Sequence, residues 1–185
     1  IWDIANTIRL VQLGAAPLFG VGTDDSHHYH GRGSSRPGRS WIMVRCDDLE
    51  ADAVTLKIQE GDFYSSSGVT LRDVQYDAKK KTLAVTIKPQ AGVTYKTQFI
   101  GTLKSVDLSA KPRLDKNGKP RRTTHIYSKD IGKVLGESEG VEATYQFTGD
   151  ELYVRAVVTS SKKHTDPTLP NQTEQAWTQP VGWKK

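Results

Sequence analysis

The spacing of hydrophobic residues predicts an α/β arrangement for the first part of the chain. Residues 1–13 carry apolar side chains at helical spacing, and Gly14 follows as a helix stop. The continuously apolar run 18–21 is typical of a strand buried on both faces of a parallel sheet. Residues 41–46 predict a second strand, and residues 49–60 predict a second helix behind an acidic cap. We therefore expect helix, strand, loop, strand and helix in this order.

After about residue 70 the pattern changes to short runs in which apolar and polar positions alternate. Leu83, Val85 and Ile87, for example, are separated by single residues, which is the period of a strand with one buried face. Turn-forming residues separate the runs, and such an arrangement favours an antiparallel sandwich or meander. The runs that predict strands are 69–76, 82–88, 94–103, 123–128, 141–148 and 152–160.

The fold class that follows is α+β, with a boundary near residue 70. Residues 1–70 form the α/β part, and residues 71–185 form a domain that resembles an antiparallel β-sandwich. Trp177, followed by Pro180, indicates an edge strand that closes this second domain.

Charge and composition narrow the range of partners. The net charge of +5 comes mainly from basic groups at 79–81, 111–122 and 184–185, which we interpret as solvated turns and a frayed end. No aromatic residues are interleaved with these basic groups, so we expect no nucleic-acid partner. No apolar run is long enough to predict a membrane span. The single cysteine, Cys46, excludes an intrachain disulfide but leaves the cellular compartment open.

The segment 23–29, Thr-Asp-Asp-Ser-His-His-Tyr, contains the candidate metal ligands of the chain. Carboxylates and neutral imidazoles are ligands of Zn, Mn and Fe ions. Asp25 and His27 are two residues apart, so in an extended segment they project to one side and are candidate metal ligands. A polar surface loop is the alternative, but the position directly after an apolar run favours a metal site. Further ligands, or partners that support the ligands, are Asp24, His28 and His30.

The next loop is rich in Gly, Ser and Arg. Guanidinium groups bind phosphate through two parallel hydrogen bonds, so Arg32, Arg36 and Arg39 are candidate phosphate-binding residues. A solvated loop is an equally good interpretation of this composition. The remaining histidines, His125 and His164, lie in the strand-rich part and are expected to be surface residues.

The octapeptide 22–29 resembles the last metal motif of the PHP (polymerase and histidinol phosphatase) superfamily of metal-dependent phosphoesterases. The resemblance implies a distorted (β/α)7 barrel that holds two or three metal ions, with an Asp-x-His pair closing the ligand set. Asp25 and His27 would be that pair, and residues 1–70 would be the C-terminal βα piece of the barrel. The likeness covers about residues 1–70, and the downstream segments that carry it are 32–33, 41–45, 61–69 and the tail 175–180.

The resemblance also implies that the site needs a further part. The family's other ligands, an opening His-x-His and a middle Glu, belong to earlier strands that this sequence does not contain. Two protein ligands fall short of the three that a catalytic zinc usually has. We therefore expect the C-terminal part of a hydrolase for small phosphate esters, completed by an N-terminal barrel portion in the same or a separate chain. The alternative is a non-catalytic β-sandwich module for binding or structure, in which the His-rich loop is incidental.

Overall fold

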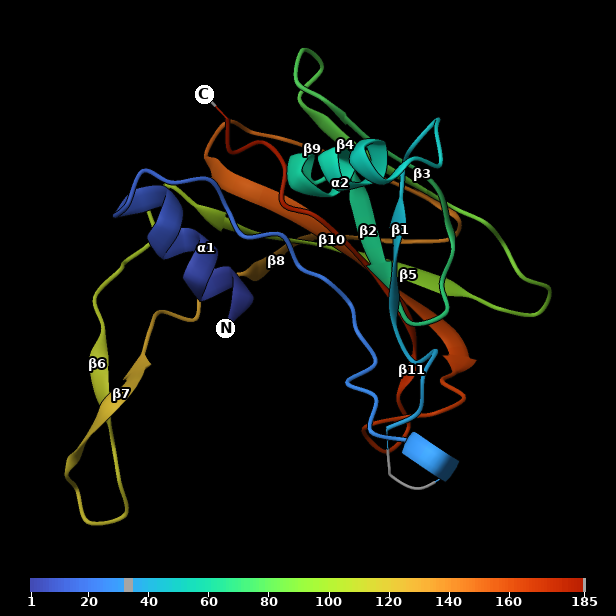
Figure 1. Cartoon of the computed structure of the whole chain (residues 1–185). Helices are drawn as coiled ribbons and strands as arrows, with labels where there is room; N and C mark the ends of the chain where they lie inside the picture. The colour runs from blue at the N-terminus through green and yellow to red at the C-terminus, as the bar shows by residue number, and fades with distance from the viewer. Residues whose placement is uncertain (32–34, 185) are drawn as a thin grey trace.

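The computed structural model describes residues 1–31 and 35–184, and antiparallel strands dominate it (Figure 1). A six-stranded sheet has the order β1 (Trp41–Val44), β2 (Phe63–Ser66), β11 (Thr173–Thr178), β10 (Glu151–Lys163), β5 (Tyr95–Leu103) and β8 (Lys133–Glu139). A three-stranded sheet has the order β3 (Leu71–Asp77), β4 (Thr82–Ile87) and β9 (Glu142–Gln146). The remaining elements are α1 (Trp2–Val11), α2 (Ala51–Glu60), a short 3₁₀ turn at Tyr29–Gly31, and a hairpin of β6 (Lys111–Leu114) and β7 (Pro120–Ile126).

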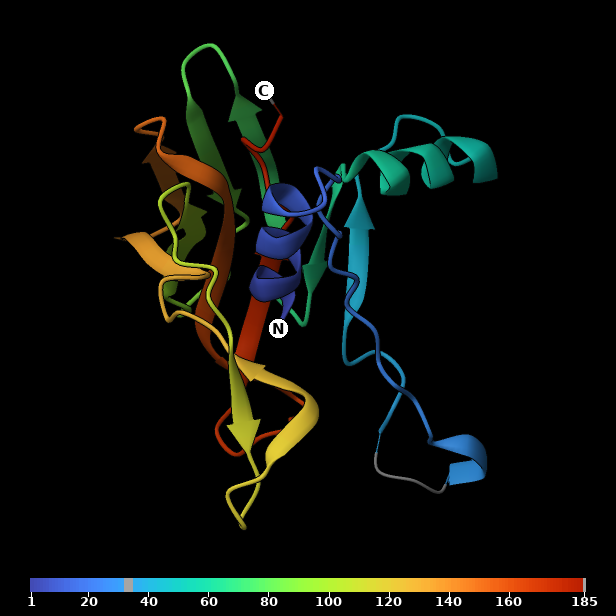
Figure 2. The same cartoon turned by 90° about the vertical axis from the view of Figure 1, so that its left-hand side faces the viewer.

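The two larger sheets pack face to face and bury one hydrophobic core between them (Figure 2). The alternation seen in the sequence places Leu83, Val85 and Ile87 of β4 in this core, each almost completely buried. The inner face of the six-stranded sheet contributes the apolar side chains that pack against them. Its main members are Tyr64, Phe99, Val154, Ala156, Val158 and Ala176. The expected antiparallel sandwich agrees with this arrangement.

The six-stranded sheet continues across residue 70. β1 pairs with β2, and β2 pairs with β11, so strands from the first part of the chain join those of the second part. The pairing of β1 is antiparallel, so this strand does not belong to the parallel sheet that the α/β pattern of the first part predicted. β11 lies inside the sheet between β2 and β10, so the edge strand expected at Trp177 is also wrong. The two-domain division and the barrel origin of residues 1–70 stay predictions.

Residues 15–22, which we name the strap, cross the outer face of the six-stranded sheet without forming the strand expected at 18–21. Side chains take the place of a neighbouring strand. Asn6 binds both the N–H and the carbonyl of Leu18, at 2.7 and 3.2 Å. Gln179 does the same for Gly20, at 2.8 and 2.9 Å, and the Ser65 hydroxyl bridges Gly20 and Gly22. These bonds pair backbone polar groups of a segment in which Pro17 is buried and the other residues are half-buried or exposed.

α1 lies on the outer face of the same sheet, and it buries its polar side (Figure 2). Asn6 and Thr7 are completely buried, whereas Val11 is 46% exposed and Ile1 is fully exposed. The apolar residues between these ends, Ile4, Ala5 and Ile8, are half-buried, so the most deeply buried part of the helix is polar. An amphipathic helix on a folded domain usually buries its apolar stripe most deeply, and here two polar residues take that place.

An ion pair between Asp3 of α1 and Arg155 of β10 joins this polar side of the helix to the sheet. Two bonds of 2.9 and 2.7 Å join the guanidinium to the carboxylate, and the Tyr153 hydroxyl donates a third at 2.9 Å. The side chains of Arg155 and Asp3 are only 9% and 18% exposed. Burial alone would raise the pKa of Asp3, but hydrogen bonding and charge from Arg155 outweigh it and hold that pKa below its usual value.

We predict that Asp3→Asn lowers the free energy of unfolding by about 3 kcal/mol, because it leaves the Arg155 charge buried and unpaired. The stabilisation from Asp3 should be complete above the ordinary carboxyl pKa and should disappear as the pH falls through the lower pKa of the folded state. Urea unfolding of the wild type and the variant, repeated along an acid pH series, measures both effects. A constant difference between the two proteins down to the lowest pH would contradict this assignment.

Candidate functional site

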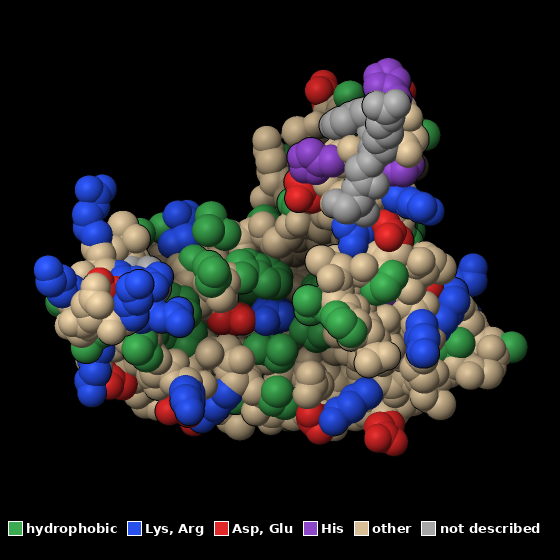
Figure 3. All heavy atoms as spheres, turned by 90° about the horizontal axis from the view of Figure 1, so that it is seen from below, with side chains coloured by type: hydrophobic (Ala, Val, Ile, Leu, Met, Phe, Trp, Pro, Cys, Tyr) green, Lys and Arg blue, Asp and Glu red, His purple; other side chains and the backbone are tan. Residues whose placement is uncertain are grey.

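The metal-ligand candidates lie on a projecting arm, residues 23–40, which we name the His loop. Figure 3 shows histidine side chains gathered on this arm, away from the body of the molecule. Asp24 holds the arm closed, because its carboxylate accepts hydrogen bonds from the backbone N–H groups of Gly38, Arg39 and Ser40 at 2.9, 2.7 and 2.9 Å. A hydrogen bond of 3.0 Å from the backbone N–H of His27 to the Ser35 carbonyl adds a second link. Asp24 is thus a brace, and both of its oxygens are occupied.

Arg39 and His164 anchor the base of the His loop on the connection between β10 and β11. Arg39 contacts Asp166 through its Nε, at 3.1 Å to the carbonyl and 3.2 Å to the carboxylate, and bonds Thr168 at 2.8 Å. His164 is 8% exposed, so the expectation of a surface residue is wrong. Its Nδ1 accepts from the Asp166 N–H, which leaves the proton on Nε2 for the Arg39 carbonyl. These contacts give Arg39 a structural role.

Asp25 and His27 are held together at the exposed side of the His loop. The Nδ1 of His27 lies 2.8 Å from the Asp25 carbonyl and 3.9 Å from its carboxylate oxygen Oδ1. Because a carbonyl can only accept, Nδ1 carries the proton, and Nε2 of the neutral ring keeps its lone pair. The side chains are 86% and 66% exposed for Asp25 and His27, respectively. Asp25 also adopts a left-handed backbone, with φ at 48°.

The other candidates occupy different environments. His30 is exposed and has a positive φ of 56°, and His28 is half-buried. Arg36 is exposed near the end of the loop, and Arg32 lies outside the described residues. The structure therefore brings together Asp25 and His27 but does not assemble Arg36 and Arg39 into a shared phosphate cradle, since Arg39 faces Asp166.

Within residues 1–31 and 35–184, no three His, Cys, Asp or Glu side chains converge in a way that could hold a metal ion. Asp25 and His27 supply two donors, and their donor chemistry suits Zn, Mn or Fe ions. A complete centre would need additional ligands, as the sequence predicts.

Comparisons with known proteins leave the family open. No family model, curated protein or solved structure matches the chain. The similarity to the PHP superfamily therefore stays a prediction based on the octapeptide 22–29 and the segments that follow it.

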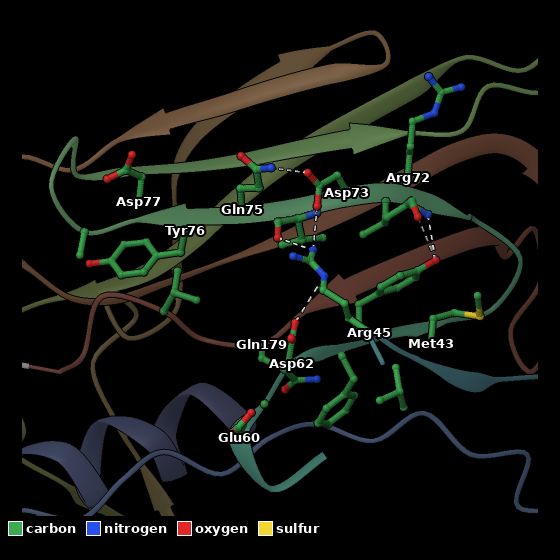
Figure 4. Close-up of a pocket in the computed structure, with 18 of the residues that line it drawn as sticks. Met43, Arg45, Glu60, Asp62, Arg72, Asp73, Gln75, Tyr76, Asp77 and Gln179 are labelled. Carbon is green, nitrogen blue, oxygen red and sulfur yellow. Dashed lines mark hydrogen bonds and ion pairs between the residues drawn. The ribbon is translucent and has the colours of Figure 1, made fainter. Parts of the chain in front are cut away.

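A groove with a volume of about 970 Å³ is the second candidate site. It lies between β1, the edge of the larger sheet, and β3, the edge of the smaller one (Figure 4). Arg45 bridges these edges, because its Nη2 donates to the Asp73 carboxylate at 2.7 Å and to the Val74 carbonyl at 2.8 Å. Asp62 lies 3.6 Å from the Nε of the same guanidinium. Sequence reasoning missed this cluster, because the packing of two different sheets brings together residues that are 28 positions apart.

The charges in the groove favour binding over acid–base chemistry. Burial raises the pKa of Tyr64 despite its hydrogen bond to the Leu71 carbonyl. The Lys80 amide is the main cause that lowers the pKa of Asp77. Both shifts move away from neutrality, so these groups keep their ordinary charge at neutral pH.

Across the described residues, no helix is long and apolar enough to cross a membrane.

We predict that Asp24→Asn opens the His loop, because an amide accepts hydrogen bonds more weakly than a carboxylate. The backbone amides of Ser40 and Gly38 are the main causes that hold the pKa of Asp24 below its usual value. The brace should accordingly be intact at neutral pH and weaken as the pH falls through that lowered pKa. Amide hydrogen exchange at Gly38, Arg39 and Ser40 reports the opening. Asp25→Asn is the matched control and should leave those three amides unchanged.

Proposed function

We propose that the His loop supplies Asp25 and His27 to a divalent-metal centre of a phosphoester hydrolase, and that a further polypeptide portion completes this centre. The observation that carries the proposal is the hydrogen bond from His27 Nδ1 to the Asp25 carbonyl. Metal-binding histidines typically donate one ring N–H to a carbonyl or carboxylate, which fixes the ring and directs the other nitrogen toward the ion. His27 has this arrangement, and its free Nε2 lies on an exposed arm.

The position of the two donors is consistent with a centre of more than one ion. Nδ1 is the ring nitrogen that faces Asp25, so Nε2 and the Asp25 carboxylate would serve different ions or different sides of one cluster. A bound ion would stabilise negative charge on the phosphoryl oxygens of the substrate. Asp24 and the Arg39–His164 anchor would hold the two ligands in place.

The exposed apolar side of α1 and the strap supports the need for a completing portion. Val11, Leu13, Leu18 and Val21 are 45–65% exposed, although they follow one another closely along the chain. Several exposed apolar side chains at the end of a helix and in the segment after it are expected where a second layer packs on them. The N-terminal barrel portion implied by the PHP resemblance would be this layer.

We predict that the chain binds Zn²⁺ or Mn²⁺ through His27 Nε2. Isothermal titration calorimetry should show affinity reduced at least about tenfold by His27→Ala and by Asp25→Asn. In ¹⁵N spectra of the histidine side chains, Zn²⁺ should shift the Nε2 resonance of His27 and leave Nδ1 protonated.

His125→Ala is the control for this measurement, because His125 is also an exposed histidine but lies on the separate hairpin β6–β7. It should leave the affinity unchanged. Equal losses in the His125 and His27 variants, or binding at Nδ1 of His27, would refute the ligand assignment.

A non-catalytic binding module is the second candidate, and the groove between β1 and β3 favours it. The groove places the Arg45–Asp73 pair beside the half-exposed aromatic ring of Tyr76, a combination that suits a small polar ligand with one flat face. Under this function the Asp25 and His27 variants would leave ligand binding intact, whereas Tyr76→Ala would weaken it.

A further inference from the structure

The hairpin β6–β7 extends from the connection between β5 and β8 and stands apart from both sheets (Figure 1). Residues 111–122, interpreted from the sequence as a solvated turn, are largely exposed and contain a turn, but two paired strands flank it. A tight turn joins them, in which the Asp115 carboxylate accepts from the N–H groups of Asn117 and Lys119 at 2.8 and 2.9 Å. The scattered basic residues of the sequence thus become one ribbon of defined shape.

The ribbon holds the whole net charge of the protein. Residues 111–126 contain six Lys or Arg residues and one acid, Asp115, which accounts for the net charge of +5. With 26 basic and 21 acidic residues in total, the rest of the chain carries 20 of each. Figure 3 shows the basic side chains gathered over this part of the molecule. The six basic residues of the ribbon are Lys111, Arg113, Lys116, Lys119, Arg121 and Arg122. All six side chains are exposed, and among the described residues none of them lies within 4.0 Å of a carboxylate.

The cations project from both faces of the ribbon. Arg121 and Arg122 are consecutive residues of β7, and consecutive side chains of a strand point in opposite directions. A flat anionic surface, such as a lipid membrane, would engage one face and leave the other in solvent. A groove with anionic walls on both sides would engage both faces at once. The major groove of a nucleic-acid duplex is such a groove, and it admits a two-stranded β-ribbon.

We infer that the hairpin β6–β7 is a binding arm for double-stranded DNA, which it contacts through the phosphate backbone. For residues 111–126, this inference departs from the sequence-based expectation that the protein has no nucleic-acid partner. Thr123 and His125 project from the same face of β7 as Arg121 and would add hydrogen bonds to the same phosphate backbone. The inference does not depend on the metal centre, since it concerns a separate part of the molecule.

Salt dependence of binding tests the arm. The full chain is titrated into a fluorescently labelled random-sequence DNA duplex, and anisotropy is followed at about 50 to 200 mM salt. Six phosphate contacts predict a slope of about −5 for log K against log salt concentration. Replacing both arginines, Arg121→Glu with Arg122→Glu, should make the slope less steep by about 2 and weaken binding about a hundredfold at the lowest salt.

The matched control is Lys79→Glu with Lys80→Glu in the exposed turn between β3 and β4, which changes the net charge by the same amount. It should alter the affinity by no more than about threefold and leave the slope unchanged. Thermal unfolding midpoints of both variants should equal that of the wild type, because all four side chains are exposed. Equal weakening in the two variants would overturn the proposal. So would a lack of binding to the duplex at the lowest salt, or tighter binding to anionic lipid vesicles or a sulfated polysaccharide than to the duplex.

Discussion

The buried ion pair between Asp3 and Arg155 is the interaction on which the placement of the candidate metal ligands depends. It fixes α1 on the outer face of the larger sheet, 152 positions away along the chain. Since α1 carries Asn6, which binds both polar groups of Leu18, the same pair also determines where the strap begins. Because a buried charge is costly without its partner, the pair favours the orientation of α1 that places Asp3 against Arg155.

Between the strap and the His loop, polar side chains hold the backbone in place, and regular secondary structure does not. Gln179 and Ser65 hold the strap on the sheet, and Asp24 and Arg39 hold the loop that follows. Such tethers fix a backbone without demanding a neighbouring strand, so the exposed tip is free to present side chains outward. A site built in this way has a defined geometry but lacks ligands. Among the described residues, no third donor joins Asp25 and His27 in a group that could hold a metal ion.

The parts of the fold that follow local rules were predictable from the sequence. The alternation in β4 and the helix 51–60, ended by Gly61 with a positive φ of 80°, are of this kind. The missed parts depend on distant partners. β2 reads Phe-Tyr-Ser-Ser and becomes a strand only because β1 and β11 pair with it on both sides. In the candidate site, spacing together with the position after an apolar run indicated Asp25 and His27, whereas the bracing role of Asp24 depends on amides 14 to 16 residues later.

The interior position of β11 has a consequence for how the protein reaches this fold during synthesis. β2 and β10 are joined only through β11, so β1 and β2 have no place in the larger sheet until residues 173–178 have left the ribosome. Before that moment the nascent chain holds two unpaired strand edges with apolar neighbours, a state prone to association with other chains. The high sequence separation of these pairings also predicts slow folding. The larger sheet is therefore completed by a strand that is made late.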